Sequence, residues 1–324
     1  MASGTLLYLS RADVESLHIS MRETIEALEQ MFREKGEGRV EMPPKPGIHP
    51  RPDAFIHAMP AYIPSLESAG IKWVSGYPRN RDQGLPYIAG LLILNDPETG
   101  IPTAVMDCTW ITAQRTGAAT ALSAKYLARK NSSTVGVIAC GVQGRSNLEA
   151  LTCLFPITHV KAYDIYPERA EAYATEMSHA LGVKAEAVSE VSAAVEGLDI
   201  VVTSGPISKH PQATIPAGWL NPGAFASLVD FDSYWQGEAL READKIATDD
   251  REQMRYYRQA GYFRDTPEPY ADLGELATGR KQGRQSHFER TMAINLGLAL
   301  DDMAVAILVH RRAVAAGIGT VLPL

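Results

Sequence analysis

Short apolar runs alternate with helical stretches between residues 134 and 250, and this alternation restricts the fold more than any other feature of the chain. One intervening stretch, residues 167–182, is amphipathic, begins with proline and ends with glycine, as helices commonly do. Alternation of this kind predicts an α/β fold with a doubly wound parallel sheet. The expected strands lie at residues 134–139, 159–164, 183–188, 199–204, 224–229 and 245–250.

The remainder of the chain predicts a second, α+β domain. Residues 10–38 begin with a serine cap and space their apolar side chains like one helix, whereas the proline-rich residues 41–55 cannot be helical. Runs at 71–77, 89–96 and 101–107 are strand-like, with a hairpin turn between the last two. We expect a last helix over 289–317. The predicted division is therefore 1–130, completed by the C-terminal helix at 300–324, and 131–299 for the parallel sheet.

Composition excludes several classes of protein. The formal net charge is -7 and no long basic run is present, so nucleic acid is not expected as a partner. The run Met303–Val309 is too short to span a membrane, and the N-terminus lacks a secretory pattern. Three cysteines do not make a disulfide framework, and the histidines show no metal-binding spacing. These features predict a reduced, cytoplasmic protein without a metal.

The stretch TVGVIACGVQGRS, residues 134–146, resembles a dinucleotide-binding loop that has lost its first glycine. Gly141 stands where the pyrophosphate would come closest, and Gly144 where the helix meets the strand. Ala139 replaces the first glycine, a small change if its φ is negative. Asp164, at the next strand end, would accept the ribose hydroxyls of NAD and repel the phosphate of NADP. The alternative is an ordinary βαβ unit with a surface aspartate.

Basic residues in the first domain are candidates for binding and catalysis. Lys72 lies inside an apolar strand, where it either reaches solvent or occupies a pocket that lowers its pKa. Arg115 stands just ahead of a helix of small residues, a place suited to an anion, or is a surface arginine. Lys45, between prolines, is a second candidate ligand for a carboxylate.

Two aspartates follow the strand expected at 224–229. Asp230 and Asp232 would lie at its carboxyl end, where ligands of open α/β sheets bind. One of the two carboxylates would then face the reactive ring of the cofactor. The alternative is a pair of turn or cap residues.

These residues together resemble those of the ornithine cyclodeaminase/mu-crystallin family, in particular its archaeal-type alanine dehydrogenases. The similarity is densest between Gly70 and Ser133 and weaker after residue 165. The resemblance implies a homodimer, with a substrate-binding and dimerisation domain joined to a Rossmann domain. The matching stretches are EMPPK, AMPAY, GIKWV, GLP, LLILNDPETGIPTAVMD, RTGAATALSAKYLARKNSS, CGVQ, VKAYD and LGE.

The resemblance assigns roles residue by residue. It implies catalytic roles for Lys72 and Asp232, rather than for Asp230. The implied substrate contacts are Lys45, His57, Arg115 and Leu296. The implied NAD contacts are Arg115, Thr116, Gly141, Val142, Gln143, Gly144, Asp164, Ile165, Tyr166, Thr203, Ser204, Val229, Asp230 and Asn295.

Four departures from the family pattern concern the substrate more than the cofactor. Ala139 replaces the first loop glycine, and Asp230 stands where the family has a glycine beside the cofactor. His57 stands where the alanine dehydrogenase-like pattern has arginine, and it is either a substrate-pocket residue whose charge can change or a packing replacement. Bulk is added at Tyr87, Tyr234 and Trp235.

Three activities are compatible with this pattern. The first is a reversible NAD-dependent oxidoreductase that interconverts a small 2-imino acid, formed from a 2-oxo acid and ammonia or an amine, and its amino acid. The second is a cyclodeaminase, a lyase in which bound NAD takes up a hydride and returns it. The third is a non-catalytic binder like mu-crystallin, which retention of Lys72, Arg115 and Asp232 argues against.

Overall fold

The computed structural model describes residues 4–324, which form two compact units. One unit comprises the chain up to Arg115 together with Leu298–Leu324, and the other comprises Thr116–Gly297. The division falls inside helix α3 (Thr109–Leu127), whereas we expected it near residue 130. No helix within residues 4–324 is long and apolar enough to cross a membrane.

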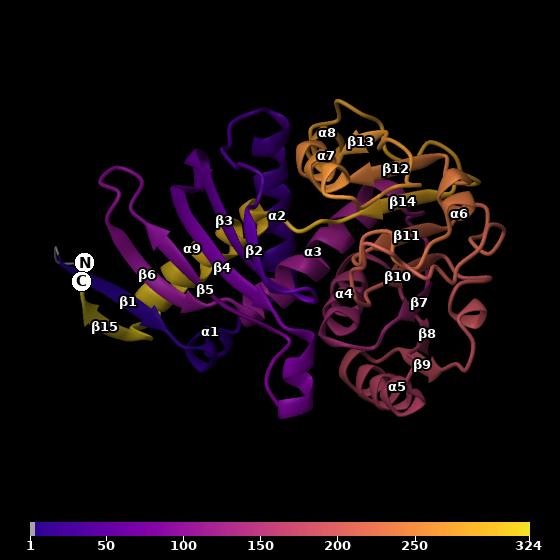
Figure 1. The fold of residues 1–324 in the computed structure, drawn as a ribbon, viewed down its shortest axis with the longest axis horizontal. Helices are drawn as coiled ribbons and strands as arrows, with labels where there is room; N and C mark the ends of the chain where they lie inside the picture. The colour runs from indigo at the N-terminus through magenta and orange to yellow at the C-terminus, as the bar shows by residue number, and fades with distance from the viewer. Residues whose placement is uncertain (1–3) are drawn as a thin grey trace. The chain divides into compact units, whose positions relative to one another are not determined.

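The first unit is built on a seven-stranded sheet. Strands β1 and β6 are parallel, and all other neighbours are antiparallel. Helix α9 (Ala299–Ala316) packs against β3, β4 and β5, and α2 (Met21–Gly36) packs against α9 (Figure 1). The strand order is β15 (Thr320–Pro323), β1 (Thr5–Leu9), β6 (Pro102–Asp107), β5 (Ile88–Asn95), β4 (Ser68–Gly76), β3 (Ala54–Ile63) and β2 (Gly47–Arg51).

The two faces of this sheet differ in what covers them. Successive side chains of a strand point to opposite faces. On β4, Ser68 and Lys72 are buried on the α9 side, where the Ser68 hydroxyl donates to the carbonyl of Met303 at 2.9 Å. Trp73 points to the other face and is 47% exposed; its neighbour Leu91 on β5 is 43% exposed. One face therefore buries a lysine, and the other presents an uncovered tryptophan.

The N-terminal helical segment is two helices rather than the one we expected. Helix α1 (Arg11–Ser16) and α2 each begin with a capping box, from Ser10 and Ser20 respectively. Between them His18 adopts a φ of 48°, a left-handed conformation that ends a right-handed helix. The second serine is the signal that the apolar spacing concealed, because it offers the chain a new helix start.

The second unit contains an eight-stranded sheet in which every described pair is parallel. Each of the six expected runs contains one strand, which confirms the doubly wound α/β fold. The order is β13 (Ala271–Asp272), β12 (Lys245–Thr248), β14 (Thr291–Ile294), β11 (Phe225–Leu228), β10 (Ile200–Thr203), β7 (Thr134–Ile138), β8 (His159–Tyr163) and β9 (Lys184–Ala187).

Helices join these strands. Helix α4 (Val142–Leu154) packs on β7 and β10, and α5 (Pro167–Leu181) packs on β8 and β9. Gly182 ends α5 with a φ of 67°, as its position predicts. Three shorter helices follow along the chain: α6 (Gly237–Arg241), α7 (Arg251–Gln259) and α8 (Leu273–Ala277).

The helix expected over 289–317 is wrong in its first part. Residues Thr291–Ile294 form β14, a fully buried strand between β11 and β12, and α9 begins only at Ala299. A short buried strand is apolar on both sides, so its sequence cannot be distinguished from the start of an apolar helix.

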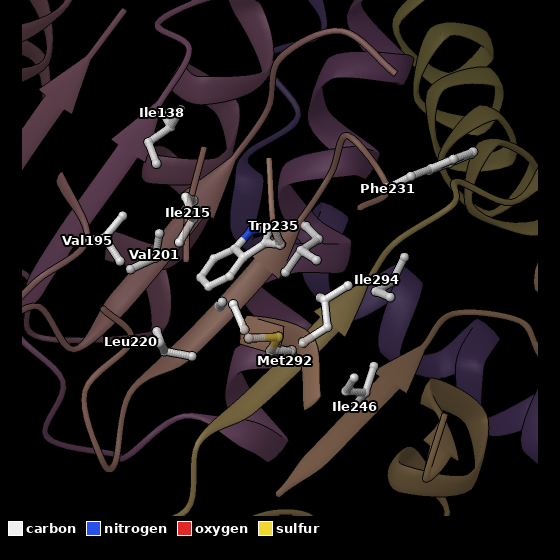
Figure 2. Packing of buried hydrophobic residues seen from close by; sticks show 14 of the residues in the cluster. Ile138, Val195, Val201, Ile215, Leu220, Phe231, Trp235, Ile246, Met292 and Ile294 are labelled. Atoms are coloured by element: carbon white, nitrogen blue, oxygen red, sulfur yellow. The ribbon is translucent and has the colours of Figure 1, made fainter. Parts of the chain in front are cut away.

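The core of the second unit surrounds a tryptophan. Trp235 is 2% exposed and lies with Ile215, Leu220 and Met292 beside the β10–β11–β14 part of the sheet (Figure 2). Its indole N–H donates to the hydroxyl of Thr203 at 3.4 Å. Trp235 therefore joins the packed interior to the carboxyl end of β10.

Candidate active site

The loop from β7 to α4 turns at Ala139, whose φ is 73°. The condition under which alanine would be a small change, a negative φ, is therefore not met. The conformation is held by the Ala139 N–H, which donates to the carbonyl of Tyr163 at 2.9 Å, and by the Ser204 hydroxyl, which donates to the Ala139 carbonyl at 3.0 Å. The loop thus keeps the left-handed turn that a glycine would favour, in a residue for which it is strained.

The two remaining loop glycines serve different purposes. A Cβ on Gly144 would lie 2.8 Å from the Ala139 carbonyl oxygen, so close packing of helix on strand requires glycine there. A Cβ on Gly141 would have no described atom within 4 Å. Nothing in the unit's own packing explains Gly141, but the approach of a ligand to the loop would.

Helix α4 begins directly after Gly141, and no described side chain caps it. The first amides of a helix have no partner inside the helix and carry the positive end of its dipole. Val142, in the first turn, is 64% exposed. This helix end therefore offers free donors to an anion such as a pyrophosphate.

Asp164 follows β8 beside the loop. One carboxylate oxygen accepts the Cys140 N–H at 2.9 Å and the other accepts the Tyr166 N–H at 3.1 Å. Each oxygen retains acceptor capacity for the hydroxyls of a ribose. Ile165 and Tyr166 beside it are 69% and 46% exposed, which leaves apolar surface for a base.

Asp230 lies beyond β11 and is fully buried. Its carboxylate accepts the Thr203 hydroxyl at 2.8 Å and the Gly205 N–H at 2.9 Å, which ties the end of β10 to the end of β11. Burial raises the pKa of Asp230 to about 7. The carboxylate is therefore occupied by groups of the protein itself.

Asp232 is separated from Asp230 by Phe231, whose φ of 65° turns the chain. The Asp232 carboxylate accepts the Thr266 hydroxyl at 2.8 Å and lines a cavity of about 350 Å³ together with Lys209 and Arg264. Burial raises the pKa of Asp232. Asp232, and not Asp230, lines this cavity.

Further residues of the expected cofactor set surround these strand ends. Asn295 accepts the Ser123 hydroxyl at 3.2 Å and donates to the Ser227 hydroxyl at 3.4 Å, so it joins α3 to β11. Gln143 lies in the first turn of α4, where its carbonyl accepts the Asn147 amide at 2.8 Å. Of the others, Thr116 and Leu296 are buried, and Val229 is partly buried.

The first unit contains a buried cluster of opposite charges. The Lys72 ammonium lies 2.6 Å from Asp302 on α9, and both side chains are almost inaccessible. The Arg115 guanidinium lies 3.2 Å from Asp302 through Nε and 3.7 Å from Asp301 through Nη1. Lys72 is thus buried beside Asp302 and does not reach solvent, and of the two alternatives given above the solvent-exposed one is wrong.

The expected setting of Arg115 is wrong. Helix α3 begins at Thr109, whose N–H is capped by Asp107 at 2.8 Å, so Arg115 lies within the helix and not ahead of it. No glycine or proline separates residues 109–115 from the small residues that follow, and the helix simply starts earlier. Carboxylates of α9, and not the α3 helix end, set the surroundings of this arginine.

Burial dominates the protonation of the cluster. It lowers the pKa of Lys72, which the nearby Arg115 lowers further and Asp302 raises. Burial also raises the pKa of the adjacent Cys108 thiol to about 11, which keeps the thiol neutral. A lysine whose pKa is lowered releases its proton more readily than a solvated one, and can therefore act as a proton donor and acceptor.

His57 and Lys45 are neighbours of this cluster. Burial and the charge of Lys45 lower the pKa of His57 to about 3, so the imidazole is neutral. Gly47 faces it on β2, and a Cβ there would lie 2.2 Å from the His57 ring. Lys45 itself is 9% exposed. The position at which alanine dehydrogenase-like sequences have arginine therefore holds an uncharged ring.

Asp301 and Asp302 are the site residues that sequence reasoning missed. The signal was present, because two consecutive acids stand at the start of a helix whose first half is otherwise apolar, "LALDDMAVAI". An acid in the first turn is common for dipole reasons alone, so the pattern does not reveal a buried ion pair.

Comparison of the whole chain with known proteins agrees with the nucleotide loop and the buried charged cluster described above. The sequence model of the ornithine cyclodeaminase/mu-crystallin family matches residues 6–317, and the chain belongs to that family. The resemblance stated from the sequence is thereby confirmed.

Individual relatives are similar over nearly the full length. The alanine dehydrogenase of Archaeoglobus fulgidus is 38% identical over 97% of each chain. The structure of Thermococcus litoralis Δ1-pyrroline-2-carboxylate reductase with NADH and L-proline has a TM-score of 0.89 and 34% identity, covering 97% of this chain and 99% of that one. An archaeal alanine dehydrogenase dimer with bound NAD has a TM-score of 0.88 and 37% identity, covering 99% of each.

The nucleotide loop of the second unit fits such a cofactor. Gly141 leaves space that a side chain would fill, the start of α4 is uncapped, and Asp164 retains acceptor capacity. These three features meet the needs of a pyrophosphate and a ribose.

Proposed function

We propose that the chain is an NAD-dependent oxidoreductase that interconverts a small 2-imino acid, formed from a 2-oxo acid and ammonia or an amine, and the corresponding amino acid. The observation that carries the proposal is the buried Lys72–Asp302–Arg115 cluster in a chain that also has a nucleotide loop. When bound, NAD would supply a hydride acceptor for the α-carbon of the amino acid, and NADH a hydride donor for the imine.

The residues of the chain supply binding and proton transfer. Arg115 and Lys45 hold the substrate carboxylate, as paired cations do for a planar anion. In the reductive direction the Lys72 ammonium polarises the C=O or C=N group and donates a proton. In the oxidative direction the neutral Lys72 amine takes that proton back. Because burial lowers the pKa of Lys72, the ammonium gives up its proton more readily than that of a solvated lysine.

The remaining roles follow the family resemblance. Asp232 stabilises the positive iminium or orients ammonia, and His57 offers a neutral hydrogen-bonding group to the substrate. Gly141, Asp164 and the first turn of α4 hold the NAD, and Gly144 lets the helix pack closely on the loop. The exposed Ile165 and Tyr166 contact its adenine.

Absorbance of NADH tests this function. Purified protein receives NADH, ammonia or methylamine, and in turn pyruvate, glyoxylate, oxaloacetate or a cyclic imino acid. We expect stoichiometric loss of NADH with one of these acids. A parallel tube holds ornithine and NAD. Ammonia released there without net formation of NADH would establish the cyclodeaminase alternative and refute the dehydrogenase.

Lys72→Ala separates catalysis from mere binding. Turnover should be abolished while NADH binding, followed by quenching of tryptophan fluorescence, stays intact. Loss of NADH binding instead would show that the role given to Lys72 is wrong. Turnover that persists would favour a chemistry in which Lys72 takes no part.

We further propose that the chain forms a homodimer through the uncovered face of the first sheet. Trp73 and Leu91 are exposed on adjacent strands, and Tyr8 on β1 is 38% exposed. Large apolar side chains in the middle of a sheet face mark an interaction surface. Light scattering should give the mass of two chains, and Trp73→Glu should give one. The cytoplasmic location expected from the sequence stays a prediction.

A further inference from the structure

Asp302 is the buried charge to which neither the sequence nor the family resemblance gives a role. It lies in the first turn of α9, with Oδ2 2.6 Å from the Lys72 ammonium and Oδ1 3.2 Å from Arg115 Nε. The Asp302 side chain has no exposed surface and that of Lys72 has 1%. One carboxylate thus touches both the group assigned to proton transfer and the group assigned to the substrate carboxylate.

The Lys72 and Arg115 side chains are the polar groups that stabilise the Asp302 carboxylate. Neither oxygen of Asp302 accepts a hydrogen bond from a backbone amide or hydroxyl in the described part of the chain. Its neighbour Asp301 differs, because its Oδ2 accepts the Leu298 N–H at 3.0 Å and lies 3.7 Å from Arg115. Asp301 caps the helix, whereas Asp302 is available to organise the cations.

We propose that Asp302 is a positioning residue for the reaction: it fixes the Lys72 ammonium and the Arg115 guanidinium in one arrangement and keeps the proton on Lys72. The proposal rests on the function proposed above. A lysine side chain has four rotatable bonds, and one close ionic contact removes most of that freedom. Without Asp302, Lys72 and Arg115 would be two like charges in a buried pocket, and mutual repulsion would move them apart.

Several charged and titratable groups face Lys72. Asp302 comes from α9, Arg115 from α3, and Cys108 from the segment before α3. Lys45 comes from the chain that leads into β2, and His57 from β3. Asp301, also on α9, faces Arg115. Cys108 and His57 stay neutral near pH 7. Asp302 is the nearest opposite charge, so its loss should release the Lys72 proton at a lower pH.

The test compares Asp302→Asn with Asp301→Asn, its matched control on the same helix turn. Turnover and KM are measured across pH in the reductive direction, with whichever acid consumes NADH. In Asp302→Asn we expect kcat to fall at least 30-fold, more than KM changes. The alkaline limb of the kcat profile should move at least one unit toward lower pH. In Asp301→Asn the limb should stay within half a unit.

A third variant, Asp302→Glu, retains the charge but cannot retain the 2.6 Å contact without movement. Its alkaline limb should stay near that of the wild type while kcat falls. This variant decides the question if Asp302→Asn does not fold. A limb displaced in Asp302→Glu as far as expected for Asn would overturn the proposal, because charge would then not be the cause.

A readout independent of turnover separates this proposal from the proposed function. Cyanate carbamylates a neutral amine, and the modified Lys72 peptide is quantified by mass spectrometry across pH. The rate divided by the concentration of cyanic acid, the reactive species, should rise at lower pH in Asp302→Asn than in the wild type or Asp301→Asn. If the carbamylation profile of Asp302→Asn coincides with those of the wild type and Asp301→Asn, the proposal is overturned. If the wild type turns over no substrate, the proposed function fails, but this titration still decides the role of Asp302.

Discussion

Replacement of Gly141 by alanine should separate ligand binding from folding more cleanly than any other change in the nucleotide loop. Gly141 has a φ of −84° and a ψ of −162°, which is extended backbone open to any residue. A Cβ there would meet no described atom within 4 Å. The folded protein thus has no steric reason to require glycine at this position.

The magnitude follows from two opposing effects on stability. Alanine in place of glycine reduces the entropy of the unfolded chain, worth about 0.4–1 kcal/mol of added stability. Gly141 is also the N-cap of α4, where alanine is poorer than glycine by about 0.5–1 kcal/mol. The two effects nearly cancel, so the melting temperature should change by less than about 2 °C.

Cofactor affinity should respond differently. The added methyl group would occupy the space through which the pyrophosphate approaches the backbone, so NADH should bind at least tenfold more weakly, about 1.4 kcal/mol. Titration calorimetry measures the affinity and scanning calorimetry the stability. Unchanged NADH affinity in a folded variant would refute the assignment of this loop to the pyrophosphate.

Three further substitutions test particular backbone and charge effects. Ala139→Gly removes a left-handed backbone strain of about 1–2 kcal/mol but adds about 0.5–1 kcal/mol of conformational entropy to the unfolded chain. The free energy of unfolding, measured with urea, should therefore rise by about 0.5–1 kcal/mol. A less stable variant would show that Ala139 is not strained. Asp164→Asn keeps an acceptor but loses the charge, and should shift the ratio of NADPH to NADH affinity at least tenfold toward NADPH; an unchanged ratio would remove the basis for NAD preference. The pKa of Asp230 is about 7 in the folded protein and about 3.9 in the unfolded chain. The stability that the protonated carboxyl contributes is therefore complete below pH 4 and is lost as the pH rises through 7. The total loss amounts to up to about 4 kcal/mol. Asp230→Asn should therefore lose less stability than the wild type between pH 5 and pH 8 in urea unfolding, and parallel losses would show that Asp230 does not titrate there.

The fold of the second unit could be predicted from local sequence patterns, because most of its strands and helices are recognisable from their own residues. The run 199–204 and the helix opened by Pro167 and closed by Gly182 could be recognised from a few residues each. Apolar runs that are buried on both sides are less informative. Thr291–Ile294 looks like the start of the following helix until its partners β11 and β12 are known.

The site was harder to predict because its contacts join distant parts of the chain. Lys72 could be recognised as an unusual strand lysine, but its partner Asp302 lies on a helix from the far end of the sequence. The conformation of Ala139 depends on hydrogen bonds to Tyr163 and Ser204, which no local rule includes. The residue types drew attention to Lys72 and Ala139, but the ion pair of Lys72 and the left-handed backbone of Ala139 follow only from the fold.

The pairing of Lys72 with Asp302 has a consequence for the order in which a newly made enzyme becomes competent. The ribosome must add 302 minus 72, or 230, residues after Lys72 before its counter-charge exists, which takes roughly 10 to 50 s at ordinary rates of synthesis. Residues 116–297, which carry the nucleotide loop, are continuous in sequence and are complete before α9 emerges. A nascent chain is therefore expected to fold its nucleotide-binding unit first and to form the Lys72–Asp302 pair last. Chains that terminate before residue 302 would have a Lys72 without its counter-charge.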